Sequence, residues 1–280
     1  MSQADGFGLA GVMGLPVAHS RSPVIHNYWL KAHGIRGSYV PLAVRPERLE
    51  DALRGLVALG FRGCNVTMPH KQTAMPKLDR VNETAKRIGA VNTIVVEADG
   101  TLSGFNNDGN GFVQSLRDAK ADWRADAGPI LLLGAGGASR AVVVALLENG
   151  AREIRIANRT AEKAQAIARE FGSAVSTVAW DDRAAAVSDV ALLVNCTDRG
   201  MAGKSALEID LSRLAPATLT ADLIYTPLET PFLAEARARG CVTVNGLGLL
   251  LNQARLAFKA WFGVMPDVTP ELIRAIEATF

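Results

Sequence analysis

Cysteine is scarce in this sequence. Three occur among 280 residues, at Cys64, Cys196 and Cys241, and no two of them stand in C-x-x-C spacing. A small, odd number of thiols without that spacing argues against a disulfide framework and against a zinc site. We expect a protein of a reducing compartment that holds no metal.

Long apolar runs and charge of one sign are also lacking. No stretch reaches the roughly 18 apolar residues that a membrane span requires, and residues 1–11 contain no basic segment followed by an apolar stretch. The net charge of +2 is scattered, without the dense basic stripe of a nucleic-acid surface. We therefore expect a soluble, cytoplasmic protein that binds neither membranes nor nucleic acid.

Apolar material, by contrast, is plentiful enough for two cores, since 49% of the 280 residues are hydrophobic. In the first part of the chain we expect strands at 9–13, 39–44, 63–66, 90–97 and 101–105, and helices at 22–32, 46–59 and 82–88. Asp99-Gly100 lies between the last two strands and is a hairpin signal. Antiparallel strands should therefore edge this first sheet.

A new alternation of strands and helices begins after a helix expected at 110–119. Strands are predicted at 129–133, 153–157, 176–180, 190–195, 219–224 and 242–244, with helices between several of them. This order is typical of a parallel, doubly wound sheet. The amphipathic segments 249–262 and 270–279 come last, and we expect them to return to the first domain. The predicted fold class is α/β with two domains.

One glycine-rich turn carries a specific chemical signal. An apolar strand runs directly into Gly134-Ala135-Gly136-Gly137-Ala138-Ser139 at the start of a helix. Backbone N–H groups at such a helix start can face a pyrophosphate with no Cβ in the way, and Ser139 takes the third-glycine position. We predict a dinucleotide site at Gly134, Gly136, Gly137, Ala138 and Ser139. The alternative is a glycine-rich turn that only allows close packing.

The residues after the next strand indicate which dinucleotide. An NAD site would place an acid there to hold the ribose 2′-hydroxyl, but this chain has Asn158-Arg159-Thr160. Arg159 offers a planar, permanently charged fork for a 2′-phosphate, and Lys163 supplies a second cation one turn into the following helix. The pattern favours NADP over NAD. A solvated arginine at a strand end is the alternative.

Polar clusters follow several strands of the first domain, where open α/β sheets place ligands. They are His19 to Pro23, Asn65 to Lys71, Ala90 to Thr93 and Asp108-Gly109. Taken singly, each also has a structural interpretation: Ser20 or Ser22 as a helix N-cap, a capped loop with a surface lysine, an Asn-anchored turn, and a second helix cap.

Taken together, these motifs strongly resemble the shikimate dehydrogenase family along nearly the whole chain. The matching segments are GxPxxHSxSPxxHN at 14–27, NVTxPxK at 65–71, GAVNT at 89–93, NDG at 107–109, GAGGASR at 134–140, NRT at 158–160 and GLGxLxxQ at 246–253. The resemblance implies an N-terminal α/β substrate-binding catalytic domain at 1–107 plus 245–280, and a Rossmann-type NADP-binding domain at 108–244. It also implies oxidation of shikimate to 3-dehydroshikimate, a step of chorismate and aromatic amino acid biosynthesis.

The resemblance further implies roles for individual residues. Lys71 and Asp108 match the family's catalytic pair. Substrate-binding positions are Ser20 and Ser22 for the carboxylate, Asn65, Thr67, Asn92 and Gln253 for the ring hydroxyls, and Asn107 and Tyr225. Gly246 falls where the family approaches the nicotinamide. The oligomeric state is not determined by these motifs, and a homodimer is our working expectation.

A lysine and a carboxylate suit this chemistry. When hydride leaves a secondary alcohol, the hydroxyl proton needs a base, and in the reverse direction the developing alkoxide needs a proton and a nearby positive charge. Free lysine, with a pKa of about 10.4, is a poor base at neutral pH. We therefore assign the proton to the pair and leave the microscopic base open.

Four residues in three segments depart from the family pattern. Asn107 replaces a threonine, Asn245 replaces an aspartate, and Asp198-Arg199 adds two charges to a loop after Thr197. These changes keep two alternatives open: a paralogue that acts on quinate or an aminoshikimate, and a non-catalytic NADP-binding sensor. Retention of Lys71 and Asp108 counts against the sensor.

Overall fold

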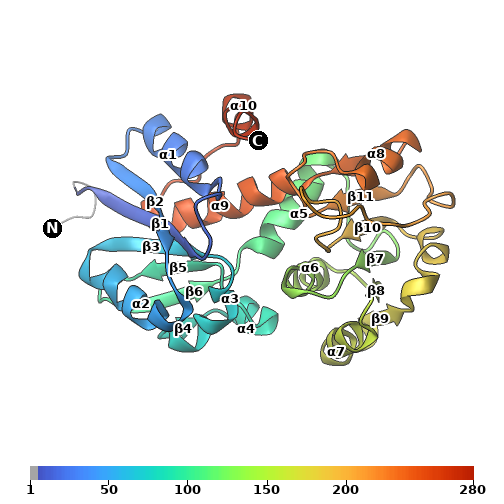
Figure 1. The fold of residues 1–280 in the computed structure, drawn as a ribbon, viewed down its shortest axis with the longest axis horizontal. Helices are drawn as coiled ribbons and strands as arrows, with labels where there is room; N and C mark the ends of the chain where they lie inside the picture. Colours follow the sequence, from blue (N-terminus) through green and yellow to red (C-terminus); the bar gives the residue numbers. More distant parts are fainter. Residues whose placement is uncertain (1–5) are drawn as a thin grey trace. The chain divides into compact units, whose positions relative to one another are not determined.

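The computed structural model describes residues 6–280; the first five residues of the predicted first domain lie outside the described range. The chain divides into two compact units. The first unit runs to Asn107 and resumes at Gln253, and the second is Asp108–Asn252. The chain passes from the second unit back to the first inside helix α9 (Gly246–Phe262). Figure 1 labels the strands and helices of both units.

The first unit is built on a six-stranded sheet in the order β2-β1-β3-β5-β6-β4. Its strands are β1 (Gly8–Gly14), β2 (Gly37–Ala43), β3 (Phe61–Val66), β4 (Arg80–Val81), β5 (Thr93–Val96) and β6 (Leu102–Phe105). β1 pairs parallel with β2 and β3, whereas β5 pairs antiparallel with β3 and β6. The hairpin predicted at Asp99-Gly100 is confirmed, with Gly100 at a φ of 84°.

The helices of the first unit contact this sheet or one another. They are α1 (Ser22–Ala32), a 3₁₀ turn η1 (Pro46–Arg48) followed by α2 (Leu49–Ala58), α3 (His70–Thr73), the 3₁₀ turn η2 (Met75–Lys77), α4 (Glu83–Ile88) and α10 (Pro270–Glu277). The N-cap of α1 is Arg21, and no side chain caps the helix. The interpretation of Ser20 or Ser22 as a cap is therefore wrong.

The C-terminal helices return to the first unit, as predicted. The Trp261 indole in α9 donates to the Ile94 carbonyl (2.9 Å), and the Trp29 indole in α1 donates to the Asp267 carbonyl (2.9 Å). Both rings are almost fully buried. Because each buried indole nitrogen finds a partner on a distant segment, the tail is held by directional bonds as well as by apolar contact.

The second unit contains an all-parallel six-stranded sheet in the order β12-β11-β10-β7-β8-β9. Its strands are β7 (Ile130–Leu133), β8 (Ile154–Ala157), β9 (Val175–Val178), β10 (Leu192–Asn195), β11 (Leu219–Asp222) and β12 (Thr243–Val244). Its helices are α5 (Asp108–Ala119), α6 (Gly137–Glu148), α7 (Ala161–Phe171), α8 (Pro231–Ala238) and the first part of α9, with short 3₁₀ turns η3 (Gly172–Ala174), η4 (Trp180–Asp182) and η5 (Ala185–Val187).

The continuous apolar run of β7 is explained by this arrangement. Ile130 and Leu132 join a core with α5 and α6, while Leu131 and Leu133 join a second core with α8. Both faces of the sheet are thus covered, which requires apolar residues at every position of a central strand. The predicted doubly wound α/β class is confirmed.

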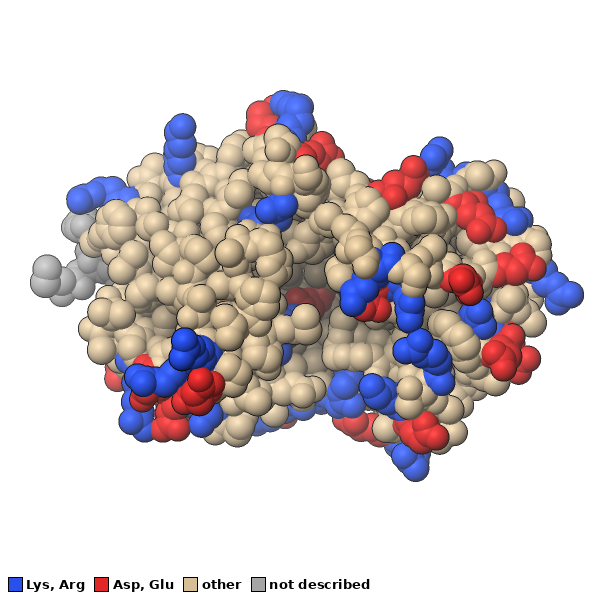
Figure 2. Space-filling view, viewed as in Figure 1, with Lys and Arg blue, Asp and Glu red and all other residues tan. Residues whose placement is uncertain are grey.

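Surface charge agrees with the composition. Positive and negative side chains alternate on the face drawn in Figure 2, and no broad area of one sign is visible there. No helix in residues 6–280 combines the length and apolarity of a membrane span. Within the same residues, no cluster of histidine, cysteine and acidic side chains could hold a metal ion.

Candidate functional site

The turn between β7 and α6 needs its first glycine for the backbone itself. Gly134 has a φ of 110°, which side-chain-bearing residues rarely adopt, and an added Cβ would lie 3.1 Å from the Cys196 carbonyl. The Gly134 N–H donates to the Ala157 carbonyl at the end of β8 (2.8 Å). This glycine therefore lets the loops after β7, β8 and β10 approach one another.

Gly136 and Gly137, the next two glycines of the turn, have a different structural explanation. A Cβ on Gly136 or Gly137 would meet no atom of the chain within 4 Å. Close packing, the alternative considered above, thus does not explain them. Both residues and Ala138 are exposed at the start of α6. Open space before helix N–H groups is what an anionic group needs in order to reach the backbone.

Ser139 shapes this turn. It is fully buried, and its hydroxyl donates to the Gly134 carbonyl (2.9 Å) and accepts from the Gly136 N–H (3.1 Å). A glycine at this position could make neither bond. The serine therefore closes the turn on itself and orients the neighbouring amides.

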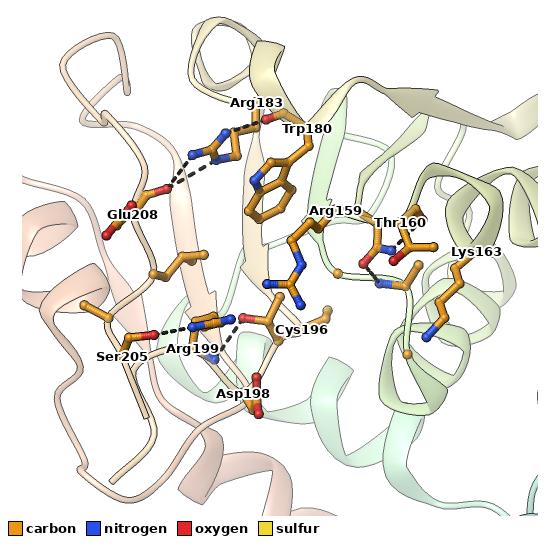
Figure 3. A pocket seen from close by; sticks show the side chains of 17 residues that line it. Arg159, Thr160, Lys163, Trp180, Arg183, Cys196, Asp198, Arg199, Ser205 and Glu208 are labelled. Atoms are coloured by element: carbon orange, nitrogen blue, oxygen red, sulfur yellow. Dashed lines mark hydrogen bonds between the residues drawn. The ribbon is translucent and has the colours of Figure 1, made fainter. Parts of the chain in front are cut away.

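A pocket of about 530 Å³ adjoins the turn. Asn158 links the loops on two sides of it, accepting from the Ala135 N–H (3.0 Å) and donating to the Thr160 carbonyl (2.7 Å). Arg159 and Lys163 are exposed and form no ion pair within the described residues. Figure 3 shows Arg159 extending toward the middle of the pocket. Two uncompensated cations beside a glycine turn make this pocket suited to a phosphorylated ligand.

One wall of this pocket was not predicted from the sequence. The Arg183 guanidinium lies 4.4 Å from the centre of the Trp180 ring and donates to the carbonyls of Trp180 (2.6 Å) and Glu208 (2.9 Å) (Figure 3). Trp180 is the first residue of η4, two positions after β9 ends at Val178, and β9 pairs with β8. The position of Trp180 after a strand was a signal, but its use required knowing which strands are neighbours.

The loop after β10 forms the pocket's base. Asn195 donates to the Arg199 carbonyl (3.1 Å) and accepts from both the N–H and the hydroxyl of Thr197. Of the two unusual charges of this loop, Asp198 pairs with Lys204 (3.6 Å), whereas Arg199 is hydrogen-bonded to the neutral Ser205 hydroxyl and keeps its positive charge. The departure from the family pattern therefore adds a cation to the lining of the pocket.

A buried carboxylate supports the same loop. Asp222, 1% exposed at the end of β11, accepts from Asn195 Nδ2 (3.1 Å), from the Ile224 N–H (3.0 Å) and from the Thr230 hydroxyl (2.7 Å). Burial raises the pKa of Asp222, although these hydrogen bonds oppose the shift. No sequence pattern singled out Asp222, because Asn195, the partner that connects it to this loop, is 27 residues away on a different strand.

Two predicted residues of the second unit lie close to this network. Gly246 lies against backbone, since a Cβ there would come within 2.1 Å of the Leu223 carbonyl oxygen. Its N–H donates to the Ile224 carbonyl (2.8 Å). Tyr225, the residue after Ile224, is half-buried. Gly246 is therefore required by packing, whatever else it contacts.

Asp108, the second residue of the predicted catalytic pair, is half-buried and is the first residue of α5.

In the first unit, the predicted amide side chains share one hydrogen-bond network. Asn65 donates to the Asn92 carbonyl (3.0 Å) and to the Thr93 hydroxyl (3.2 Å). Asn92 accepts from the Asn107 N–H (2.9 Å) and donates to Gln253 Oε1 (3.4 Å). Asn107 also donates through its side chain to Thr93 (3.1 Å). Four of the predicted positions are thus brought together, with Thr93 as a shared partner that sequence reasoning missed.

The remaining first-unit positions follow β1 and β3 along the chain: Ser20 just before α1, Ser22 as its first residue, Thr67 directly after β3, and Lys71 within α3. Ser22 is buried, and its N–H donates to Ser20 Oγ (3.3 Å). The Thr67 N–H donates to the Met13 carbonyl (2.9 Å). Lys71, in α3, is half-buried rather than exposed, and its carbonyl accepts from the Val91 N–H (2.8 Å). These backbone bonds join the Lys71 loop to the segment that carries Asn92.

Fold and sites together define a class of protein: an α/β dehydrogenase-type chain with a Rossmann sheet, a dinucleotide-binding turn and a separate polar site in its other unit. Family models match most of the chain. They are the shikimate dehydrogenase substrate binding domain at residues 12–94, shikimate/quinate 5-dehydrogenase at 118–208 and the shikimate 5′-dehydrogenase C-terminal domain at 246–270. The chain belongs to the shikimate dehydrogenase family.

Individual relatives agree. A shikimate dehydrogenase (NADP(+)) of Rhodospirillum rubrum is 51% identical over 272 residues, covering 96% of each chain. The shikimate 5-dehydrogenase of Thermus thermophilus, solved with NADP(H) and shikimate, superposes with a TM-score of 0.87 at 38% identity over 98% of this chain and 100% of that one. The quinate dehydrogenase of Corynebacterium glutamicum, solved with NAD, reaches a TM-score of 0.88 at 31% identity over 97% and 98%.

Proposed function

We propose that this protein is an NADP-dependent shikimate dehydrogenase that interconverts shikimate and 3-dehydroshikimate. The observation that carries the proposal is the amide network of Asn65, Asn92, Asn107 and Gln253, in which every side chain except Asn107 is buried. A site that pairs its own buried groups with ring hydroxyls rejects analogues that lack one of them. The full-length similarity to enzymes of this name supports the same substrate.

The two units take different roles in this proposal. Residues 1–107 together with 245–280 bind the substrate, and residues 108–244 bind the cofactor. Ser20 and Ser22 bind the carboxylate, and Asn65, Thr67, Asn92, Asn107, Tyr225 and Gln253 bind the rest of the substrate. NADP, when bound, accepts the hydride that leaves the alcohol carbon. Lys71 and Asp108 handle the hydroxyl proton.

The cofactor pocket fits a 2′-phosphorylated dinucleotide. Gly136 and Gly137 leave space where a Cβ would stand, and Ser139 holds the amides of the turn. Arg159 and Lys163 supply the positive charge, and no acid stands at the end of β8 to hold a free 2′-hydroxyl. Asn158 and Thr160 shape the loop around them.

The test is a steady-state assay of the purified protein, in which formation of reduced nicotinamide is followed with shikimate or quinate and with NADP or NAD. We expect rapid turnover with shikimate and NADP only. Turnover confined to quinate would favour the second candidate, a quinate-type enzyme. Two observations support this candidate: the similarity to the Corynebacterium glutamicum protein and the exchange at Asn107. Cofactor binding without any turnover would indicate a sensor.

The preference for NADP should depend on Arg159. We expect Arg159→Ala to raise KM for NADP roughly 10-fold to 100-fold, because a charge-assisted pair with a phosphate contributes about 1.5–3 kcal/mol. KM for NAD should change little. The exposed Arg213, far along the chain in the same unit, provides the matched control Arg213→Ala. Equal losses for both cofactors would contradict the assignment of Arg159 to the 2′-phosphate.

The two kinds of glycine in the turn should respond differently to alanine. Gly136→Ala should weaken NADP binding at least about 10-fold while changing the free energy of unfolding by less than about 1 kcal/mol, because its Cβ meets only open space. Gly134→Ala should destabilise the fold by about 1–3 kcal/mol, since its φ of 110° is strained for alanine. Cofactor titration and chemical denaturation measure the two effects. Unchanged NADP affinity in Gly136→Ala would contradict this site.

A cytoplasmic location and a role in chorismate and aromatic amino acid biosynthesis belong to the same proposal. All three cysteines are free, and burial raises the pKa of Cys64 and of Cys196 to about 12. Thiols held in the protonated form are unreactive, and three unpaired cysteines suit a reducing compartment. We retain the homodimer as the proposed assembly, to be checked by sedimentation.

A further inference from the structure

Tyr39 lies at the centre of the first unit and was not singled out from the sequence. It is 1% exposed, in β2, with its register partner Ala10 in β1. Its hydroxyl donates to Asn65 Oδ1 at 2.7 Å, the shortest bond in the amide network.

The orientation of the Asn65 amide follows from its other partners. The amide atom that does not contact Tyr39 lies 3.0 Å from the Asn92 carbonyl oxygen, and a carbonyl oxygen can only accept a hydrogen bond. The nitrogen must therefore face Asn92, and the oxygen must face Tyr39. Asn65 Nδ2 donates its two hydrogens to the Asn92 carbonyl and the Thr93 hydroxyl. Only Oδ1, which has two lone pairs, retains capacity for a further hydrogen bond.

We infer that Tyr39 is a positioning residue of the substrate site, which locks the Asn65 amide so that Asn65 accepts a hydrogen bond from a ligand hydroxyl and does not donate one. The inference rests on the proposed function for the identity of the ligand.

The ring of Tyr39 is itself held in place. His26 stacks on it with ring centres 4.1 Å apart and an angle of 8° between the planes, and Trp261 lies against it at 5.9 Å. This aromatic packing does not depend on the hydroxyl. Tyr39→Phe therefore removes the hydrogen bond to Asn65 while the ring retains its neighbours.

We expect Tyr39→Phe to raise KM for shikimate about 3-fold to 10-fold, since a net hydrogen bond contributes that much to binding. KM for NADP should stay unchanged, and kcat should fall less than KM rises. Tyr28→Phe is the matched control, because the Tyr28 hydroxyl pairs with Thr269 (3.2 Å), outside the amide network. A control that behaves like Tyr39→Phe would overturn the inference.

A double-mutant cycle decides whether Tyr39 acts through Asn65. In an Asn65→Ala background, adding Tyr39→Phe should change KM for shikimate by less than about 2-fold, because the group that Tyr39 orients is already gone. If the two changes instead multiply, Tyr39 acts independently of Asn65 and the inference fails.

A measurement without substrate separates this inference from the proposed function. With asparagine labelled in its side-chain nitrogen, the NMR signal of the Asn65 amide should shift in Tyr39→Phe and stay in place in Tyr28→Phe. A shifted signal in a protein that does not turn over shikimate would reject the proposed function and support the positioning role. An unshifted signal would overturn the positioning role, whatever the kinetics show.

Discussion

Lys71→Ala is expected to lower kcat for shikimate oxidation about 10²-fold to 10⁴-fold, with a much smaller change in substrate affinity. The reason is that a positioned acid–base group contributes this factor by moving the proton in the transition state, whereas the ring hydroxyls and carboxylate have other partners. Lys71 is half-buried in α3, and its carbonyl is bonded to Val91. Steady-state kinetics, with affinity from direct shikimate titration, measure both quantities.

The control for this prediction is a nearby lysine of the same unit. Lys77 pairs with Glu50 at 3.1 Å on the surface, and its loss removes a charge without touching the amide network. Lys77→Ala should retain turnover, because exposed ion pairs contribute little to stability. Normal turnover in Lys71→Ala would reject the assignment of the proton to this residue, and loss of folding, seen as a lowered unfolding midpoint, would call for Lys71→Met instead.

The second large effect is a loss of stability in acid caused by His26. This ring is fully buried among Trp29, Tyr39, Phe258 and Trp261, and neither ring nitrogen has a hydrogen-bond partner within the described residues. Burial lowers the pKa of His26 to about 3. Burying the charged imidazolium without a partner is costly, so the folded state keeps the ring neutral.

The direction of this stability change follows from the difference between the pKa of His26 in the folded state and its pKa in the unfolded chain. In the unfolded chain the histidine has a pKa of about 6.5, so below that pH the unfolded state binds a proton that the folded state refuses. The free energy of unfolding therefore falls as the pH drops from about 6.5 toward 3. The slope of about 1.4 kcal/mol per pH unit gives a loss of about 2 kcal/mol between neutral pH and pH 5.

Urea denaturation of the wild-type protein and of His26→Phe over this range measures the effect. Phenylalanine keeps an aromatic ring among these side chains but cannot bind a proton. The free energy of unfolding of the variant should therefore fall about 2 kcal/mol less than that of the wild type between neutral pH and pH 5. His33 is exposed at the end of α1, and His33→Phe serves as the control that should keep the wild-type slope. Parallel slopes for wild type and His26→Phe would show that His26 does not cause the acid sensitivity.

Much of the fold followed from local signals. The period of the apolar residues located nearly every strand within a few positions, and Asp99-Gly100 located the hairpin of β5 and β6. The one helix expected at 46–59 begins instead with the 3₁₀ turn η1, and α1 lacks the predicted serine cap. Caps and first turns differ because they depend on a few hydrogen bonds whose partners the sequence pattern does not identify.

For the sites, the sequence by itself determined the elements whose chemistry is local: the glycine turn of 134–139, the missing acid before Arg159, and the amide positions that the motifs mark. The tertiary structure alone decided which strand ends meet. It placed the Trp180 and Arg183 wall beside the turn, put Asp222 under the Asn195 loop, and committed both hydrogens of Asn65 to partners inside the chain. These features join segments far apart in sequence, and strand pairing brings such segments together through contacts that no local periodicity encodes.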